Sequence, residues 1–195
     1  QVKMSAFARL NYNYKSKYYV TATLRADGSS NFAANRKWGF FPSAALKWNI
    51  RQEDFLKYVR WLSQLELRVS YGRTGNDDIQ AYRSLQAYTS GFSYVFDGVN
   101  GPVYTPSRLA NPNLTWETTD QLNVALETAM FSNRLSIQLE GYMSKTKDLL
   151  LNVRTMNSTG YSSRLSNLGK TSNMGVELSI ESKNIERSEF GWTTN

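Results

Sequence analysis

Apolar residues recur at even positions from Val2 to Ala26, and most of the odd positions between them are polar. The alternation runs through two segments, Val2 to Tyr14 and Tyr18 to Ala26, which a charged turn at Lys15 to Lys17 separates. Because successive side chains of a strand point to opposite faces, the pattern predicts a long antiparallel hairpin with one apolar and one polar face. Strands of soluble proteins usually have about five or six residues, whereas a strand that crosses a bilayer needs roughly nine to eleven. The length of this pattern therefore indicates a transmembrane β-barrel.

The same alternation returns farther along the chain. It predicts further strands at Trp38 to Asn49, Leu65 to Gly72, Gln121 to Met130, Leu135 to Met143 and Met174 to Glu181. The predicted fold class is all-β, with about seven to eight strands of a larger transmembrane antiparallel β-barrel. Arg51 to Leu62 differs, because its apolar residues have helical spacing, and we expect a single short helix there. Pro42 lies inside a predicted strand and implies a bulge or a locally missing ladder bond.

The connections between these strands alternate in length. They are short after Tyr14, Phe131 and Ile180, and long after Asp27, Gly72 and Lys145. Outer-membrane barrels have short periplasmic turns and longer extracellular loops, so we expect the long connections to lie outside the cell. The apolar face should then contact lipid at Leu10, Leu24, Leu46, Val69, Val124, Ile137 and Val176. The polar face should point inward at Arg9, Arg25, Lys47, Arg68, Asn123, Gln138 and Glu177.

Composition limits the other classes of protein. The 195 residues are 41% hydrophobic, and no run approaches the roughly eighteen apolar residues of a membrane-spanning helix. The formal charge is +7, but the basic residues are scattered along strands and turns, which favours solvated or lumen-facing charges over a nucleic-acid partner. The chain has no cysteine, so it has no disulfide or thiolate site. It has no histidine either, and therefore lacks the commonest general base and metal ligand.

Six short motifs, in this order, carry a resemblance to a known family. They are RADGSSNF at 25–32, WGFFPSAALKWNI at 38–50, LRVSYGRTGN at 67–76, NPNLTWETT at 111–119, KTKDLLLN at 145–152 and NMGVELS at 173–179. Together they resemble the C-terminal barrel region of the SusC/RagA family of TonB-linked outer-membrane transporters, over nearly the whole chain. The resemblance implies a barrel of about 22 strands with a plug in its lumen. It also implies the outer membrane of a Gram-negative bacterium as the location.

The same resemblance implies partners and a function. It implies energy supplied through the TonB complex, a SusD-like surface lipoprotein as partner, and import of an oligosaccharide or peptide substrate. Nothing in residues 1–195 matches the plug, the TonB-contacting segment or a signal peptide of that family. We therefore expect residues 1–195 to be part of one TonB-dependent receptor β-barrel domain in a longer polypeptide. The alternative is a non-transporting outer-membrane β-barrel with a surface adhesion or structural role.

The candidate binding residues lie in the long connection between Gly75 and Thr115, which we expect to be a loop without strands of its own. Aromatic rings can stack on sugars or pack on a partner protein, and long loops are often functional. The aromatic residues of this loop are Tyr82, Tyr88, Phe92, Tyr94, Phe96 and Tyr104. Alternatively, these rings pack the loop against itself and the plug.

No metal site or cofactor is expected. Asp77 with Asp78, or Asp97 with Asn100, offer fewer oxygen ligands than the six to eight that calcium takes, and turn formation explains these residue types. An enzyme is not expected either. A serine nucleophile has no histidine partner, and Glu53 and Asp54 are adjacent on the expected helix, where successive side chains diverge.

Two further groups of residues have expected roles along the barrel. Polar residues should line the lumen, against the plug or along a substrate path; they are Glu66, Arg68, Glu127, Gln138 and Glu140. Aromatic residues near strand ends should form a girdle at the membrane interface. These are Tyr12, Tyr14, Tyr18, Trp48 and Phe131.

Overall fold

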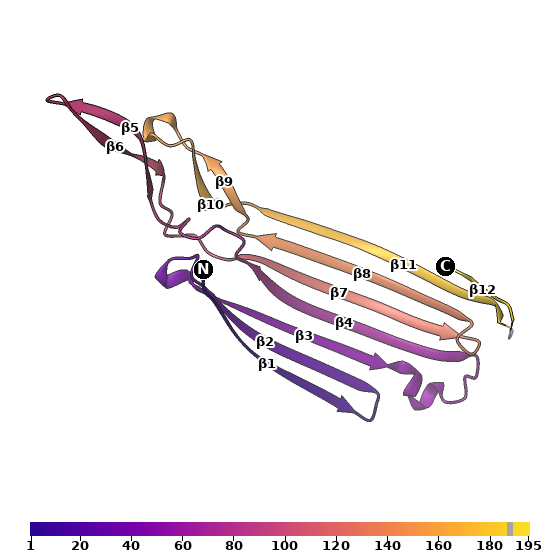
Figure 1. The fold of residues 1–195 in the computed structure, drawn as a ribbon. Coiled ribbons are helices and arrows are strands. Elements are labelled where there is room, and N and C mark those ends of the chain that lie inside the picture. The colour runs from indigo at the N-terminus through magenta and orange to yellow at the C-terminus, as the bar shows by residue number, and fades with distance from the viewer. Residues whose placement is uncertain (187–188) are drawn as a thin grey trace.

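The computed structural model describes residues 1–186 and 189–195, and antiparallel strands make up most of it (Figure 1). Eight strands form one sheet in the order β1-β2-β3-β4-β7-β8-β11-β12. Their bounds are β1 Lys3–Tyr14, β2 Tyr18–Ser29, β3 Trp38–Asn49, β4 Leu62–Asn76, β7 Glu117–Met130, β8 Leu135–Lys147, β11 Lys170–Glu186 and β12 Gly191–Thr194. The all-β prediction and the predicted order of strands are confirmed, and several strands are longer than expected.

Two smaller hairpins project from one end of this sheet (Figure 1). They are β5 Ala87–Phe96 with β6 Val99–Arg108, and β9 Leu150–Arg154 with β10 Ser163–Asn167. The first lies within the connection that we expected to contain no strands, so that prediction is wrong. Asp97 and Gly98 explain the hairpin, since both have positive φ, 49° and 76°, as a type I′ turn requires.

The cross-strand register assigns the residues of the large sheet to two faces, because directly opposed residues share a face. Leu46 lies opposite Val69, which lies opposite Val124, and this series continues through β8 and β11. All seven residues expected on the apolar face fall on this one side, which we call the apolar face. The seven residues expected to point inward fall on the other side, the polar face.

The three connections expected to be long leave from one end of the sheet, here called the loop end, and the other end is called the turn end (Figure 1). The loop end carries residues 30–37, 77–116 and 148–169, with the 3₁₀ turns η1 Ala34–Arg36 and η4 Asn157–Thr159. The turn end carries residues 15–17, 131–134 and the β3–β4 connection, residues 50–61. This last connection is longer than residues 30–37 at the loop end, so connection length does not alternate strictly. The prediction of a short turn just after Ile180 is wrong, because β11 continues to Glu186. The connection that follows β11 includes residues 187–188, which lie outside the described residues.

The prediction of a single short helix at Arg51 to Leu62 is also wrong. Two 3₁₀ turns, η2 Ile50–Gln52 and η3 Asp54–Leu56, occupy the start of this connection at the turn end. Glu53 separates them with an extended backbone, φ −77° and ψ 148°, because its carboxylate is drawn to Lys17 of the β1–β2 turn. No helix in the described residues is long and apolar enough to cross a membrane.

Pro42 causes no bulge, so that half of the prediction is wrong. It lies opposite Leu24 in a β2–β3 register that runs without a shift. The β3–β4 ladder begins at Ser43, one residue beyond Pro42. Pro42, which has no backbone N–H, therefore lies just outside the β3–β4 ladder. This agrees with the expected alternative, a locally missing ladder bond.

Candidate functional site

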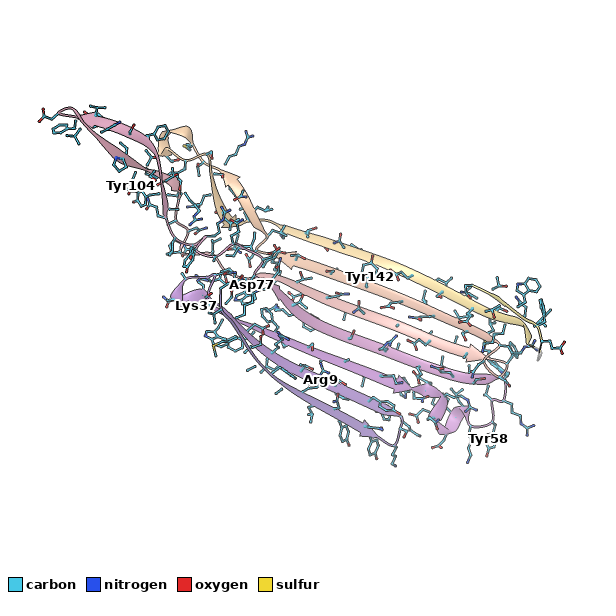
Figure 2. The ribbon with its side chains drawn as sticks, in the orientation of Figure 1. Arg9, Lys37, Tyr58, Asp77, Tyr104 and Tyr142 are labelled. Carbon is cyan, nitrogen blue, oxygen red and sulfur yellow. The ribbon has the colours of Figure 1, made fainter. Side chains whose placement is uncertain are left out.

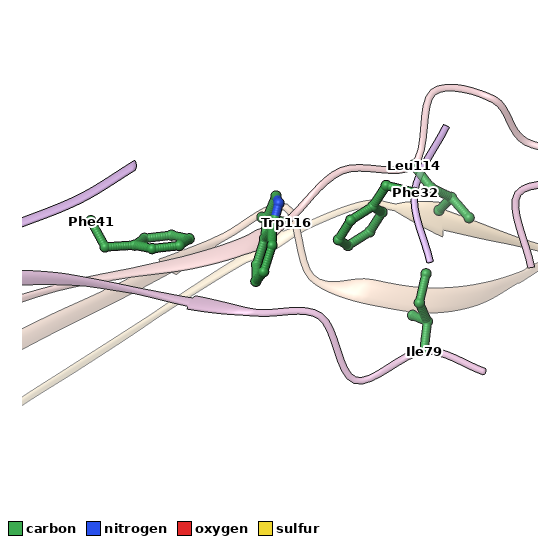
Figure 3. Close-up of a cluster of buried hydrophobic side chains, with 5 residues drawn as sticks. All are labelled: Phe32, Phe41, Ile79, Leu114 and Trp116. Atoms are coloured by element: carbon green, nitrogen blue, oxygen red, sulfur yellow. The ribbon is translucent and has the colours of Figure 1, made fainter. Parts of the chain in front are cut away.

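The main buried core lies at the loop end rather than in the middle of the sheet, and Figure 3 shows its side chains in close-up. The loop-end cluster consists of Phe32, Phe41, Ile79, Leu114 and Trp116, which come from four separate segments of the chain. The Trp116 ring contacts two others, with centroids 5.4 Å from Phe32 and 5.3 Å from Phe41. Aromatic pairs at these distances and angles are favourable beyond the area that they bury. The cluster therefore fixes the starts of the long connections on the sheet.

Two glycines make room for the Phe41 ring, because a side chain at either position would collide with it. A Cβ atom at Gly39 would lie 2.5 Å from the Phe41 ring, and a Cβ at Gly75 would lie 2.0 Å from it. The Trp116 indole Nε1 donates to the carbonyl oxygen of Lys37 at 3.1 Å. Thus β3, β4 and the segment before β7 are locked together at the loop end.

Buried polar groups extend this anchoring into the connection after β4. Asn31 is fully buried, and its Nδ2 donates to the carbonyl oxygens of Asp77 and Ile79 at 3.3 and 3.0 Å. The Asp77 carboxylate accepts from Lys3 Nζ of β1 at 2.7 Å. Asp77, weighed above as a calcium ligand, is thus an ion-pair partner of the first strand.

The β9–β10 hairpin is docked on the same cluster. Asn111 Nδ2 donates to the carbonyl oxygen of Leu165 at 2.8 Å. Asn167 bonds the backbone of Thr115 twice, accepting from its N–H at 2.9 Å and donating to its carbonyl oxygen at 2.8 Å. Leu150 and Leu165 pack against the cluster. The result is a fixed platform from which residues 87–108 project.

Residues 87–108 form a projecting hairpin, here called the aromatic arm, that carries five of the six predicted binding residues. Phe92, Tyr94 and Phe96 occupy alternate positions of β5 and share one face. A register shift between Ser90 and Phe92 reverses the faces of the residues that precede it. Tyr88 and Tyr104 lie on the opposite face by the same register. Figure 2 shows Tyr104 on the arm, away from the large sheet. The structure therefore divides the predicted set into two faces.

The aromatic rings on the first face of the arm are exposed, and two of them are stacked. The Tyr94 and Phe96 rings are stacked with centroids 6.5 Å apart, and both border a shallow depression that also contains Val99 and Val103. Phe92 is 66% exposed and Phe96 is 74% exposed. These rings therefore do not pack onto the loop-end cluster.

The sixth predicted residue, Tyr82, lies outside the arm, in the turn before it, with a φ of 63°. The arm is fixed at its base rather than along its length. Arg108 donates to the carbonyl oxygens of Leu85 and Tyr82 at 3.1 and 2.8 Å, and Gln86 bonds the Tyr161 hydroxyl at 3.0 Å. The base is therefore held by the turn that precedes the arm and by Tyr161 of the β9–β10 connection, while the aromatic face stays exposed.

The residues expected in the lumen all lie on the polar face, where several of them form ion pairs. Lys47 Nζ lies 3.1 Å from the Glu66 carboxylate, and Arg68 pairs with Glu127 on the next strand. Gln138 donates to Glu140 at 3.3 Å. Among the aromatic residues expected in a girdle, Tyr18 stacks on Trp48 with centroids 6.2 Å apart at the turn end.

Sequence reasoning missed the network around Glu53, which it had weighed only as a neighbour of Asp54. The Glu53 carboxylate accepts from the Tyr18 hydroxyl at 2.7 Å, from Lys17 Nζ at 2.9 Å and from Trp48 Nε1 at 3.1 Å. These hydrogen bonds, with that from Tyr18 the largest, lower the pKa of Glu53 to about 2. The Asp54 side chain is 98% exposed, so the two carboxylates do not converge on one site.

Comparison with known proteins places this chain in a defined class. The profile of the family described as "TonB dependent receptor-like, beta-barrel" matches residues 2–195. The chain belongs to this family of TonB-dependent receptor barrels.

Relatives within the class agree with the resemblance to SusC/RagA proteins. TonB-dependent receptor P3 of Formosa agariphila is 45% identical over 192 residues, and TonB-dependent receptor SusC of Bacteroides thetaiotaomicron is 38% identical over 193. These alignments cover 98% and 97% of this chain, and 19% of each relative. The RagAB peptide importer in its open-open state has a TM-score of 0.87 and 32% identity, covering 97% of this chain and 20% of that one. The chain thus spans about a fifth of the length of its relatives.

Proposed function

We propose that this chain is part of the wall of a TonB-dependent importer in the outer membrane of a Gram-negative bacterium. The apolar face would contact lipid, and the polar face would line a lumen that holds a plug. The open edges at β1 and β12 would pair with further strands of the same barrel, since an unpaired edge in lipid costs several kcal/mol per unsatisfied backbone group. The connections at the loop end would then face the cell exterior.

The substrate would be an oligosaccharide or a peptide, and the outer partner a SusD-like lipoprotein. Similarity to a peptide importer supports the peptide class. The oligosaccharide class rests on the resemblance to the SusC/RagA family. Energy would come through TonB. Catalysis is no part of this function.

The aromatic arm carries the proposal for this particular chain. Its face of Phe92, Tyr94 and Phe96 is exposed, and it projects from the loop end on a base that is held by hydrogen bonds. Exposed aromatic patches of this kind mark protein or ligand contacts, and aromatic residues are enriched among those that dominate binding energy. The arm would bind the lipoprotein or the substrate at the outer mouth of the barrel.

The test compares the two faces of the arm in the full-length transporter. Replacing Phe92, Tyr94 and Phe96 together by alanine should weaken association with the lipoprotein, or substrate uptake, by about tenfold or more. Replacing Tyr88 and Tyr104, on the other face, is the matched control and should have a much smaller effect. Co-purification of the tagged lipoprotein and growth on the imported nutrient are the two readouts. Unchanged values for both, with normal surface levels, would reduce the arm to a structural role.

A further inference from the structure

The apolar face changes character abruptly at the loop end. Its apolar surface ends on β7, β8 and β11 at Leu122, Met143 and Met174. One position farther along the same face, Asp120 of β7 lies opposite Lys145 of β8. The apolar belt is therefore followed directly by charged side chains on the same side of the sheet.

Four basic residues lie at this end of the same face, and we call them the basic rim: Arg73, Lys145, Lys147 and Lys170. Lys147 lies directly opposite Lys170 in the β8–β11 ladder. Like charges opposed in this way repel one another. All three lysines are exposed.

The one acidic residue is already engaged. Asp120 accepts two hydrogen bonds from Arg73, at 2.7 and 3.0 Å, and a third from the Tyr71 hydroxyl at 2.8 Å. Lys147 Nζ is 3.8 Å from its second oxygen. Within the part of the chain that the structure describes, Lys145 and Lys170 form no ion pair. The rim therefore has positive charge without enough acidic partners.

The turn end of the same face is different. The apolar face ends there in Tyr18 of β2, Trp48 of β3, Met130 of β7 and Leu135 of β8. On these strands, the positions that border the apolar belt are therefore basic at the loop end and uncharged at the turn end, where basic residues such as Lys15, Lys57 and Arg60 lie in the connections between strands. Such a one-sided arrangement matches a bilayer whose two leaflets carry different charge.

We propose that the basic rim binds the phosphate groups of lipid headgroups in the leaflet at the loop end, which is the phosphorylated glycolipid of the outer leaflet. Acyl chains would lie along the apolar belt at Met143 and Met174. The phosphates would reach Lys145, one position beyond on the same face, and Lys147 and Lys170, two positions beyond. A phosphate between Lys147 and Lys170 would relieve their repulsion through charge-assisted hydrogen bonds. This inference rests on the membrane orientation in the proposed function, and not on the aromatic arm or on transport.

The experiment measures lipid binding by the full-length, detergent-solubilised transporter after removal of its endogenous lipid. Phosphorylated lipid A should raise the thermal unfolding temperature, while dephosphorylated lipid A should have little effect. Each basic residue beside an anionic lipid surface typically contributes about fivefold in affinity, so the triple variant K145Q/K147Q/K170Q should bind roughly 100-fold more weakly. The charge-preserving variant K145R/K147R/K170R should bind as the natural protein does.

The matched control removes three positive charges at the turn end, in the variant K15Q/K57Q/R60Q, and should bind lipid A normally. Inorganic phosphate at the same concentration serves as a separate arm. Equal stabilisation by both forms of lipid A, normal binding by K145Q/K147Q/K170Q, or full stabilisation by inorganic phosphate alone would overturn the proposal. If the triple variant does not assemble, K170Q alone should still bind about fivefold more weakly. Uptake and lipoprotein association are not measured, so a failure here is distinct from a failure of the proposed function.

Discussion

The ring of Phe41 occupies the space in which any side chain at position 75 would begin. A Cβ atom added to Gly75 would lie 2.0 Å from Cζ of Phe41 and 2.3 Å from its Cε1. Real Cβ atoms essentially never come so close to another heavy atom. Since Phe41 belongs to the buried loop-end cluster, it has little freedom to move away.

Gly75→Ala should therefore destabilise the barrel, by about 1 to 3 kcal/mol, the usual range for overpacking a filled core. The folded fraction of the full-length transporter in urea, read as heat-modifiable mobility on gels, measures the change. Gly141→Ala, on β8, is the matched control, because a Cβ atom added at Gly141 would have no other heavy atom within 4 Å. Equal urea midpoints for the two variants would contradict the close contact with Phe41.

The pKa of Glu53, lowered from 4.5 to about 2, makes the turn end sensitive to acid. A lowered carboxyl pKa stabilises the folded state fully above the unfolded value, and this contribution is lost as pH falls from about 4.5 through about 2. Glu53→Gln should thus lower the urea midpoint at pH 7 and flatten its decline across that window. Asp54→Asn, which changes an exposed neighbour, should leave the curve nearly unchanged. Identical pH profiles for Glu53→Gln and the natural protein would refute the network.

Asn31→Ala should loosen the connection after β4. The change leaves the carbonyl oxygens of Asp77 and Ile79 without their donor, at a cost of about 1 to 3 kcal/mol for buried groups. Amide hydrogen exchange should accelerate in residues 77–86 of the full-length protein. Asn13→Ala removes a single exposed hydrogen bond to Ser16 and serves as the control. Unchanged exchange in residues 77–86 would show that Asn31 does not hold them.

Val124→Arg tests which face meets lipid. Val124 lies opposite Val69 and Gly141 in the middle of the apolar face. An arginine near the bilayer midplane on a lipid-facing position costs about 2 to 4 kcal/mol, which a reversible folding experiment in lipid vesicles can measure. Gln121→Arg, on the polar face of the same strand, should cost much less. Equal costs at the two positions would disprove the lipid assignment of the apolar face.

Sequence alone determined seven strands of the large sheet and their faces, because the alternation of side chains along a strand is a local property. The third strand was predicted and observed at Trp38 to Asn49. The turn at Lys15 to Lys17 placed Tyr14 opposite Tyr18, and the register of both strands follows from that pairing. Every residue assigned to one face from the alternation lies on that face.

The aromatic arm was within reach of sequence reasoning and was missed. Asp97 and Gly98 stand between two runs of aromatic and β-branched residues, which is a strong hairpin signal. They were interpreted only as loop residues. The register shift at Gly91, which separates Phe92 from Tyr88 by face, was missed together with the hairpin, although a glycine inside a strand often marks a bulge.

Only the tertiary structure decided which distant residues meet. Phe32, Phe41 and Trp116 lie in three separate motifs of the sequence, and nothing local indicates that they share one cluster. Glu53 interrupts an apparent helix because its hydrogen bonds to Lys17 and Tyr18 outweigh local spacing. Short-range alternation fixes the face on which a side chain lies, whereas contacts between segments depend on how the whole sheet brings its loop end together.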